Sequence, residues 1–152
     1  MRVEIVAVGR ARAGPERALY ESYLHRIRWD IGLREVEEKR PLPADRLKER
    51  EAELLLESVP QGFAVVALDE TGTDLSSEAL AARIGAWRDD SRPGIAFLIG
   101  GADGLAAAVR ERAELVLSFG RQTWPHMMVR AMLAEQIYRA QQILAGHPYH
   151  RQ

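Results

Sequence analysis

The chain has 152 residues, of which 47% are hydrophobic and 28% charged, and its formal net charge is −1. This length and composition are typical of one soluble globular domain, which we expect to span residues 1–152. The absence of cysteine excludes disulfides and thiolate metal sites. No apolar run approaches the ~20 residues that cross a bilayer, and the first residues lack the layout of a signal peptide, so we expect a cytoplasmic protein.

Charge is unevenly distributed along the chain. Residues 121–152 carry four arginines against one acidic residue, which gives a local net charge of +3, and three of the four histidines. An anionic partner would be attracted to this segment. A basic, solvated helix end would give the same composition without any partner, and both interpretations stay open on charge alone.

The first half of the chain alternates between strand and helix patterns. Arg2–Val8 predicts a strand that Gly9 closes, and Pro15 is suited to the first turn of a helix. A buried helical stripe follows at Leu19, Tyr20, Tyr23, Leu24 and Ile27. Leu33–Val36 is a short candidate strand. Asp45 is a candidate N-cap for a helix that continues to about Ser58, with Leu47, Leu54 and Leu55 facing inward.

The second half continues the alternation with more strongly apolar strands. Phe63–Leu68 and Ile95–Ile99 have the nearly continuous apolar character of strands covered on both faces. Between them, Ser76 or Ser77 can cap a helix with Leu80, Ile84 and Trp87 inward. After Gly104 we expect a short helix, a strand at Leu115–Leu117, and a long helix from Pro125 to about Leu144.

This order predicts an α/β fold with a mostly parallel sheet flanked by helices. Ligands of such sheets bind beyond the carboxyl ends of the strands. The rule indicates the three loops that follow Leu68, Ile99 and Leu117.

Two of these loops have compositions that suit a ligand. Gly100–Gly104 holds three glycines in five residues, which lets backbone amides approach a ligand closely. It matches neither the dinucleotide fingerprint nor a P-loop, and a tight strand-to-helix turn explains it equally well. The loop 118–125 is longer than most connections of its kind, which favours a binding role.

The long C-terminal helix has polar residues on an otherwise apolar face. His126 and Arg130 are four residues apart at its start, and Arg139 follows. Two cations at the positive end of a helix indicate an anion nearby. No His-Glu-x-x-His pattern or carboxylate–histidine grouping supports a metal, so we expect none.

Several short motifs, taken together, resemble one family. They are Leu68-Asp69, Leu98-Ile99-Gly100-Gly101-x-x-Gly104-Leu105, Pro125-His126-x-x-x-Arg130, Glu135-Gln136-x-Tyr138-Arg139-Ala140 and the terminal His147-Pro148-Tyr149-His150-Arg151. In this order and spacing they resemble the 23S ribosomal RNA pseudouridine N3-methyltransferases, small members of the trefoil-knotted SPOUT class. The resemblance covers the chain from end to end.

The resemblance implies a deep C-terminal trefoil knot, a homodimer and S-adenosyl-L-methionine as cofactor. It implies that the cofactor is held, mainly through backbone groups, by Leu68, Gly100, Phe119, Gly120, Arg121, Gln122, Thr123 and Trp124. It places near the target base the catalytic candidates His126, Arg130, Arg139, Tyr149, His150 and Arg151, with the terminal residues reaching the site of the partner subunit. Gly120-Arg121-Gln122 is more polar than the family pattern, and Trp124 is bulkier.

The implied reaction is methylation of N3 of a pseudouridine in 23S rRNA within the assembled ribosome. The imide must lose a proton, which a neutral histidine or a tyrosinate-like group could accept, and arginines could stabilise the resulting anion. Two alternatives remain. One is a knotted methyltransferase that acts on transfer RNA, and the other is a non-enzymatic ribosome-binding factor of the same fold.

Overall fold

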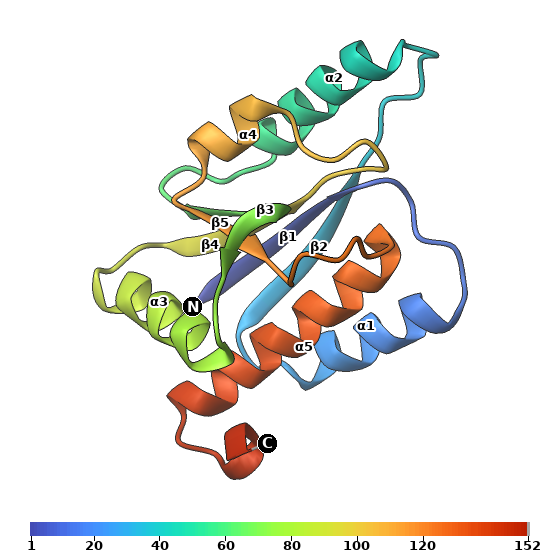
Figure 1. Ribbon diagram of the computed structural model, residues 1–152. Coiled ribbons are helices and arrows are strands. Elements are labelled where there is room, and N and C mark those ends of the chain that lie inside the picture. The colour runs from blue at the N-terminus through green and yellow to red at the C-terminus, as the bar shows by residue number, and fades with distance from the viewer. Residues whose placement is uncertain (152) are drawn as a thin grey trace.

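The computed structural model describes residues 1–151. For His150 and Arg151 it describes the backbone but not the side chain. Five strands and five α-helices alternate along the chain (Figure 1). They are β1 (Arg2–Val8), α1 (Pro15–Arg26), β2 (Asp30–Val36), α2 (Ala44–Glu57), β3 (Ala64–Asp74), α3 (Ser77–Asp89), β4 (Gly94–Ile99), α4 (Ala107–Arg112), β5 (Leu115–Ser118) and α5 (His126–Leu144). A short 3-10 helix, η1 (Pro148–Arg151), follows α5.

The strands form one sheet in the order β2-β1-β4-β3-β5, and every neighbouring pair is parallel. The predicted fold class is therefore confirmed. The strand order places the carboxyl ends of β4, β3 and β5 side by side, which brings together the loops that follow Leu68, Ile99 and Leu117. The trefoil knot stays a prediction.

Helices cover both faces of the sheet (Figure 1). On one face, Ile5, Val66 and Phe97 pack in a core cluster with residues of α3 and α5. On the other face, Val65 and Leu98 pack against α2 and α4. Successive residues of β3 and β4 thus alternate between two cores, which explains why these strands are apolar along their length.

Most elements lie where the sequence predicts them, and the main differences concern α2, α5 and β3. In the predicted buried stripe of α1, Leu19 is 51% exposed. Asp45 does not cap α2: Pro43 takes the N-cap position, and Asp45 lies in the first turn, where its charge still suits the helix dipole. Leu55 is buried as predicted, whereas Leu47 and Leu54 are only half-buried. The long helix begins at His126, with Pro125 as its N-cap.

The third difference concerns β3, which extends six residues beyond the predicted end at Leu68. Its pairing with β5 stops at Leu68 and resumes at Thr73 after a bulge. Gly72 makes this possible, because a Cβ there would lie 2.5 Å from the carbonyl oxygen of Val116. We conclude that the intervening residues 69–72 arch away from the sheet at its carboxyl edge.

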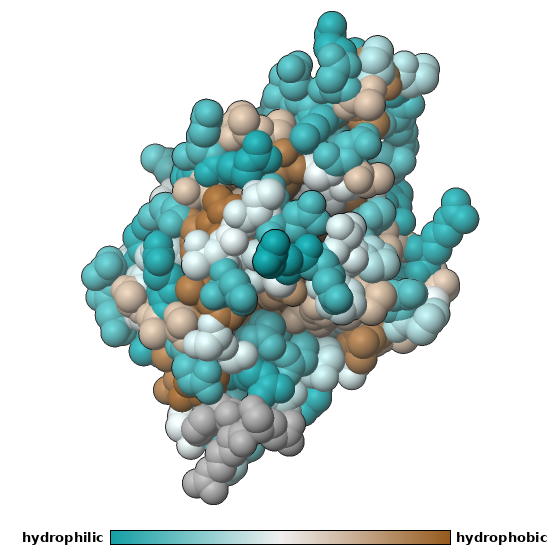
Figure 2. All heavy atoms as spheres, viewed as in Figure 1, coloured by the Kyte–Doolittle hydropathy of each residue, from teal (hydrophilic) through white to brown (hydrophobic). Residues whose placement is uncertain are grey.

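The surface of the face shown in Figure 2 is predominantly polar, and its apolar residues gather in small separate groups. None of the helices in the described part of the chain is both long and apolar enough to cross a membrane. Within residues 1–151, no group of three or more His, Cys, Asp or Glu side chains could hold a metal ion.

Candidate functional site

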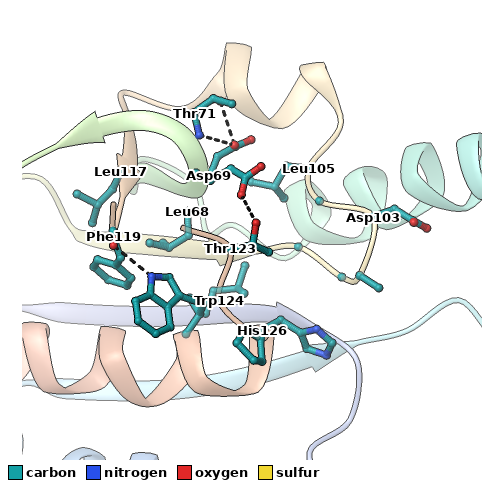
Figure 3. A pocket seen from close by; sticks show the side chains of 18 of the residues that line it. Leu68, Asp69, Thr71, Asp103, Leu105, Leu117, Phe119, Thr123, Trp124 and His126 are labelled. Atoms are coloured by element: carbon teal, nitrogen blue, oxygen red, sulfur yellow. Dashed lines mark hydrogen bonds between the residues drawn. The ribbon is translucent and has the colours of Figure 1, made fainter. Parts of the chain in front are cut away.

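A cavity of about 820 Å³ lies at the carboxyl edge of the sheet, between the bulged part of β3 after Leu68 and the loops that follow β4 and β5. Figure 3 shows its lining, with Leu68, Leu105 and Leu117 on the sheet side and Trp124 and His126 on the side of α5. The volume lies within the range of pockets that bind small molecules and cofactors. This edge is also where parallel sheets generally bind ligands.

Most of the residues expected to hold the cofactor line this cavity. They are Leu68, Gly100, Phe119, Gly120, Gln122, Thr123 and Trp124. Arg121 is not among the lining residues, and its side chain is exposed. The side chain of Arg121 therefore faces solvent, while its neighbours Gly120 and Gln122 line the cavity.

The loop after β5 is held in shape by short-range hydrogen bonds. The hydroxyl of Ser118 accepts the N–H of Gly120 at 3.1 Å and lies 2.7 Å from the Gly120 carbonyl oxygen. The indole of Trp124 donates to the Phe119 carbonyl at 3.3 Å (Figure 3). Gly120 adopts φ +106°, a conformation that favours glycine. These contacts fold the loop back on itself beside the cavity, which its residues Phe119 and Gly120 line.

The opposite wall carries charged side chains that the sequence did not single out as a group. Thr123 donates to a carboxylate oxygen of Glu70 at 2.9 Å, which links the loops after β5 and β3. Arg110 of α4 donates to Leu105 O at 2.6 Å and pairs with Asp69 at 3.3 Å. Lys48 of α2 also lines the cavity. No sequence signal connects Lys48 and Arg110 to this site, because only tertiary packing brings α2 and α4 here.

The catalytic candidates separate into two groups about 20 Å apart, because Arg139 follows His126 by 13 residues along α5 and a helix rises ~1.5 Å per residue. His126, at the start of α5, lines the cavity. Arg139 and Tyr149 lie at the far end, where the Tyr149 hydroxyl donates to Glu135 at 3.1 Å and the Arg139 guanidinium lies 4.8 Å from the Tyr149 ring centroid. The side chains of His150 and Arg151 lie outside the described residues. A single chain thus does not bring these candidates together.

Arg130 is buried, and its side chain is 0% exposed. The anion expected beside it is the carboxylate of Glu35, 2.6 Å from Nη1, and Nη2 donates to the Gly9 carbonyl at 2.9 Å. Burial alone would raise the pKa of Glu35, but the hydrogen bonds from Arg130 and from the N–H of Ala11 outweigh it and lower that pKa. Within one chain Arg130 therefore contacts neither solvent nor the cavity, and its position suits a structural role.

A second hollow of about 650 Å³ lies between α1, α3 and α5. Its lining is mainly apolar and includes Leu19, 51% exposed, and Met128, 38% exposed. Leu117 and Phe119 line both this hollow and the first cavity. The two sites therefore lie on either side of the same strand and loop.

A family model described as "Predicted SPOUT methyltransferase" matches residues 1–150. The chain belongs to the SPOUT methyltransferase family. Its cavity is accordingly the candidate S-adenosylmethionine site of a methyltransferase.

Curated relatives within the SPOUT family are similar over the full length. The ribosomal RNA large subunit methyltransferase H of Rhodospirillum centenum is 61% identical over 151 residues, covering 99% of each chain. The proteins of the same name from Paramagnetospirillum magneticum and Paracoccus denitrificans are 60% and 52% identical, covering 99% and 100% of each chain. Among solved structures, a putative methyltransferase from Legionella pneumophila with bound SAM has a TM-score of 0.48 and 10% identity, covering 92% of this chain and 66% of that one.

The lining of the cavity fits S-adenosylmethionine chemically. The apolar walls formed by Leu68, Leu105 and Leu117 suit an adenine ring. The carboxylates of Asp69 and Glu70 suit a ligand that carries positive charge on its sulfonium and ammonium groups. A Cβ on Gly100 would lie 2.8 Å from the Gly104 carbonyl oxygen, so this loop tolerates no side chain at that position. The glycine keeps the backbone of the wall close to whatever fills the cavity.

Proposed function

We propose that this protein methylates N3 of a pseudouridine in 23S rRNA of the assembled large ribosomal subunit, with S-adenosyl-L-methionine as methyl donor, in the cytoplasm. The observation that carries the proposal is the cavity of about 820 Å³ at the carboxyl edge of the sheet, with His126 on its wall. The shared name of the full-length relatives supports the substrate class. Residues 1–152 act in this proposal as one domain.

In the proposed reaction the cofactor supplies an activated methyl group. The protein therefore has to bind and orient the cofactor and the target base, and to accept one proton from the base. Leu68, Gly100 and the loop from Phe119 to Trp124 hold the cofactor. His126 lines the same cavity, and in this proposal it accepts the imide proton of the target base. Holding nitrogen and methyl carbon in line supplies much of the rate acceleration.

We further propose that the active unit is a homodimer. Arg139 and Tyr149 lie too far from the cavity to act there in the same chain, so a second chain must bring them. The apolar hollow beside α5 offers a surface for that second copy, because Leu19 and Met128 are exposed on it. Since Phe119 lines both the hollow and the cavity, a partner seated on the hollow lies next to the cofactor.

Tyr149 serves in this proposal to anchor the tail. Burial raises its pKa to about 12, and the charge of Glu135 and the hydrogen bond to it act in the same direction. Its phenol is therefore neutral near pH 7 and does not accept the imide proton. The ring packs edge-on against Tyr138 with the centroids 4.8 Å apart. The neutral phenol stabilises the docked tail fully below pH ~10, the ordinary pKa of tyrosine. This stabilisation is lost as the pH rises through the raised pKa of about 12.

Substitutions of Tyr149 test this assignment. We expect Tyr149→Phe to keep the ring contacts, to reduce kcat less than about tenfold, the equivalent of ~1.4 kcal/mol, and to leave the pH–rate profile between pH 6 and 9 unchanged. Tyr149→Ala removes the ring and should approach complete loss of methyl transfer. A Phe variant whose deficit grows with pH would instead identify the tyrosinate as the proton acceptor.

The proposed function is tested with purified protein, labelled S-adenosylmethionine and ribosomes from cells that lack the modification, with the methylated fragment mapped by mass spectrometry. We expect one methyl group on a pseudouridine of 23S rRNA and none on the naked RNA. Label on transfer RNA would keep the reaction class and replace the substrate. A protein that binds ribosomes but neither binds cofactor nor transfers methyl would be a non-enzymatic ribosome-binding factor.

A further inference from the structure

The loop between β1 and α1, residues 9–14, carries two exposed arginines, Arg10 and Arg12. A Cβ on Gly101, which lines the cavity, would lie 3.1 Å from a methyl group of Val8. A Cβ on Gly9 would lie 4.0 Å from the terminal methyl of Met127, the neighbour of His126. The loop thus leaves the sheet (dark blue in Figure 1) directly next to the cavity and the first turn of α5.

The backbone of this loop is fixed by a buried ion pair. Arg130 donates to the carbonyls of Val8, at 3.3 Å, and Gly9, and it pairs with Glu35. Glu35 also accepts the N–H of Ala11 at 2.6 Å. Burying a guanidinium has a large desolvation cost, and such pairs are weak contributors to stability. The arrangement does, however, hold residues 8, 9 and 11 in one conformation, which positions the arginines at 10 and 12.

The charges around the loop leave these arginines available to an anion. Arg10 pairs with Glu37 at 3.2 Å, but both side chains are well exposed, and such a pair contributes little in water. Arg12 makes no ion pair within residues 1–151 for which contacts are described. The carboxylate of Glu35 is already engaged by Arg130. Because the whole chain has a net charge of −1, attraction of a polyanion must come from local groups of this kind.

We propose that Arg10 and Arg12 bind phosphates of the RNA strand next to the target nucleotide. A base that enters the cavity to meet the cofactor brings its own strand with it, and the start of this loop at Val8 and Gly9 lies beside Gly101 of the cavity wall and Met127 of α5. Guanidinium groups bind phosphate oxygens through paired hydrogen bonds and fix the register of the strand without reading its sequence. The inference rests on the proposed function, since it takes RNA as the substrate, and it adds the surface that orients this RNA.

The experiment compares the wild type with the double variant Arg10→Ala/Arg12→Ala on ribosomes lacking the modification, measuring kcat/KM over a series of KCl concentrations. We expect kcat/KM to fall at least about tenfold, mostly through KM. The slope of log kcat/KM against log salt should become shallower by about one for each lost phosphate contact. Cofactor affinity, measured by calorimetry, should be unchanged.

The matched control is Arg88→Ala/Arg112→Ala, which removes the same charge at the opposite edge of the sheet. These arginines end α3 and α4, just before the amino ends of β4 and β5. Arg10→Lys/Arg12→Lys, which keeps the charge, should retain most of the salt slope. Wild-type kcat/KM and salt slope in the Ala variant, or an equal loss in the control, would overturn the inference. Failure of the wild type to methylate ribosomes would instead count against the proposed function.

Discussion

Substituting Gly100 by Val is expected to abolish detectable S-adenosylmethionine binding. Gly100 directly follows β4 and lines the cavity, and even a Cβ there would lie 2.8 Å from the Gly104 carbonyl oxygen and 2.9 Å from a methyl of Leu105. The Gly104 N–H donates to the Gly101 carbonyl at 3.0 Å, so this turn is closed and has little room to yield. A branched side chain must displace the turn or enter the cavity. A loss of only ~1.4 kcal/mol in binding free energy already weakens affinity tenfold.

Calorimetric titration with cofactor measures this effect, and Gly32→Ala provides the control. A Cβ on Gly32 would contact the Glu4 side chain at 3.5 Å, an ordinary van der Waals distance, on the edge strand β2. The control should bind cofactor as the wild type does and unfold at a similar temperature. If Gly100→Val binds cofactor normally, the cavity is not the cofactor site.

The sheet and the position of its ligand edge follow directly from sequence patterns. Phe63–Leu68 and Ile95–Ile99 read as strands covered on both faces, and the structure places each between two helical layers. The rule for parallel sheets then brings the three loops to one edge. These predictions succeed because periodicity and strand polarity are local properties of the chain.

The features that sequence patterns did not resolve depend on contacts between distant residues. Arg130 interrupts an apolar face, and such a pattern does not distinguish a catalytic arginine from one that is buried in an ion pair. Its partner Glu35 lies 95 residues away along the chain. The polar segment 69–74 likewise has no strand pattern in its sequence. It continues β3 because Thr73 and Asp74 pair with β5.

The role proposed for the tail depends on the arrangement of distant parts of the chain. Removal of residues 149–152 is expected to abolish methyl transfer while cofactor affinity stays near that of the wild type. Tyr149 is held by Glu135, Tyr138 and Arg139, which lie from the middle of α5 onward, away from the cavity at its start. Truncation therefore leaves the cavity wall untouched and removes only the groups proposed to act in the partner subunit. Filter assays of methylated ribosomes and calorimetry with cofactor separate the two effects, and equal loss of both would refute the assignment.

Mixing two inactive proteins distinguishes action in the partner from action within one chain. The truncated chain keeps its cavity but lacks a tail, whereas Gly100→Val keeps its tail but lacks a working cavity. In a mixed dimer, the cavity of the truncated chain faces the intact tail of the Gly100→Val chain, so one complete site forms. Since random exchange makes half of all dimers mixed and each has one site in place of two, we expect about a quarter of the wild-type rate per dimer. A mixture that stays inactive, although mixed dimers are detected by mass spectrometry, would show that the tail does not act across the dimer. Activity that appears only on mixing would require a site built from both chains, because neither variant alone holds a cavity and a tail together.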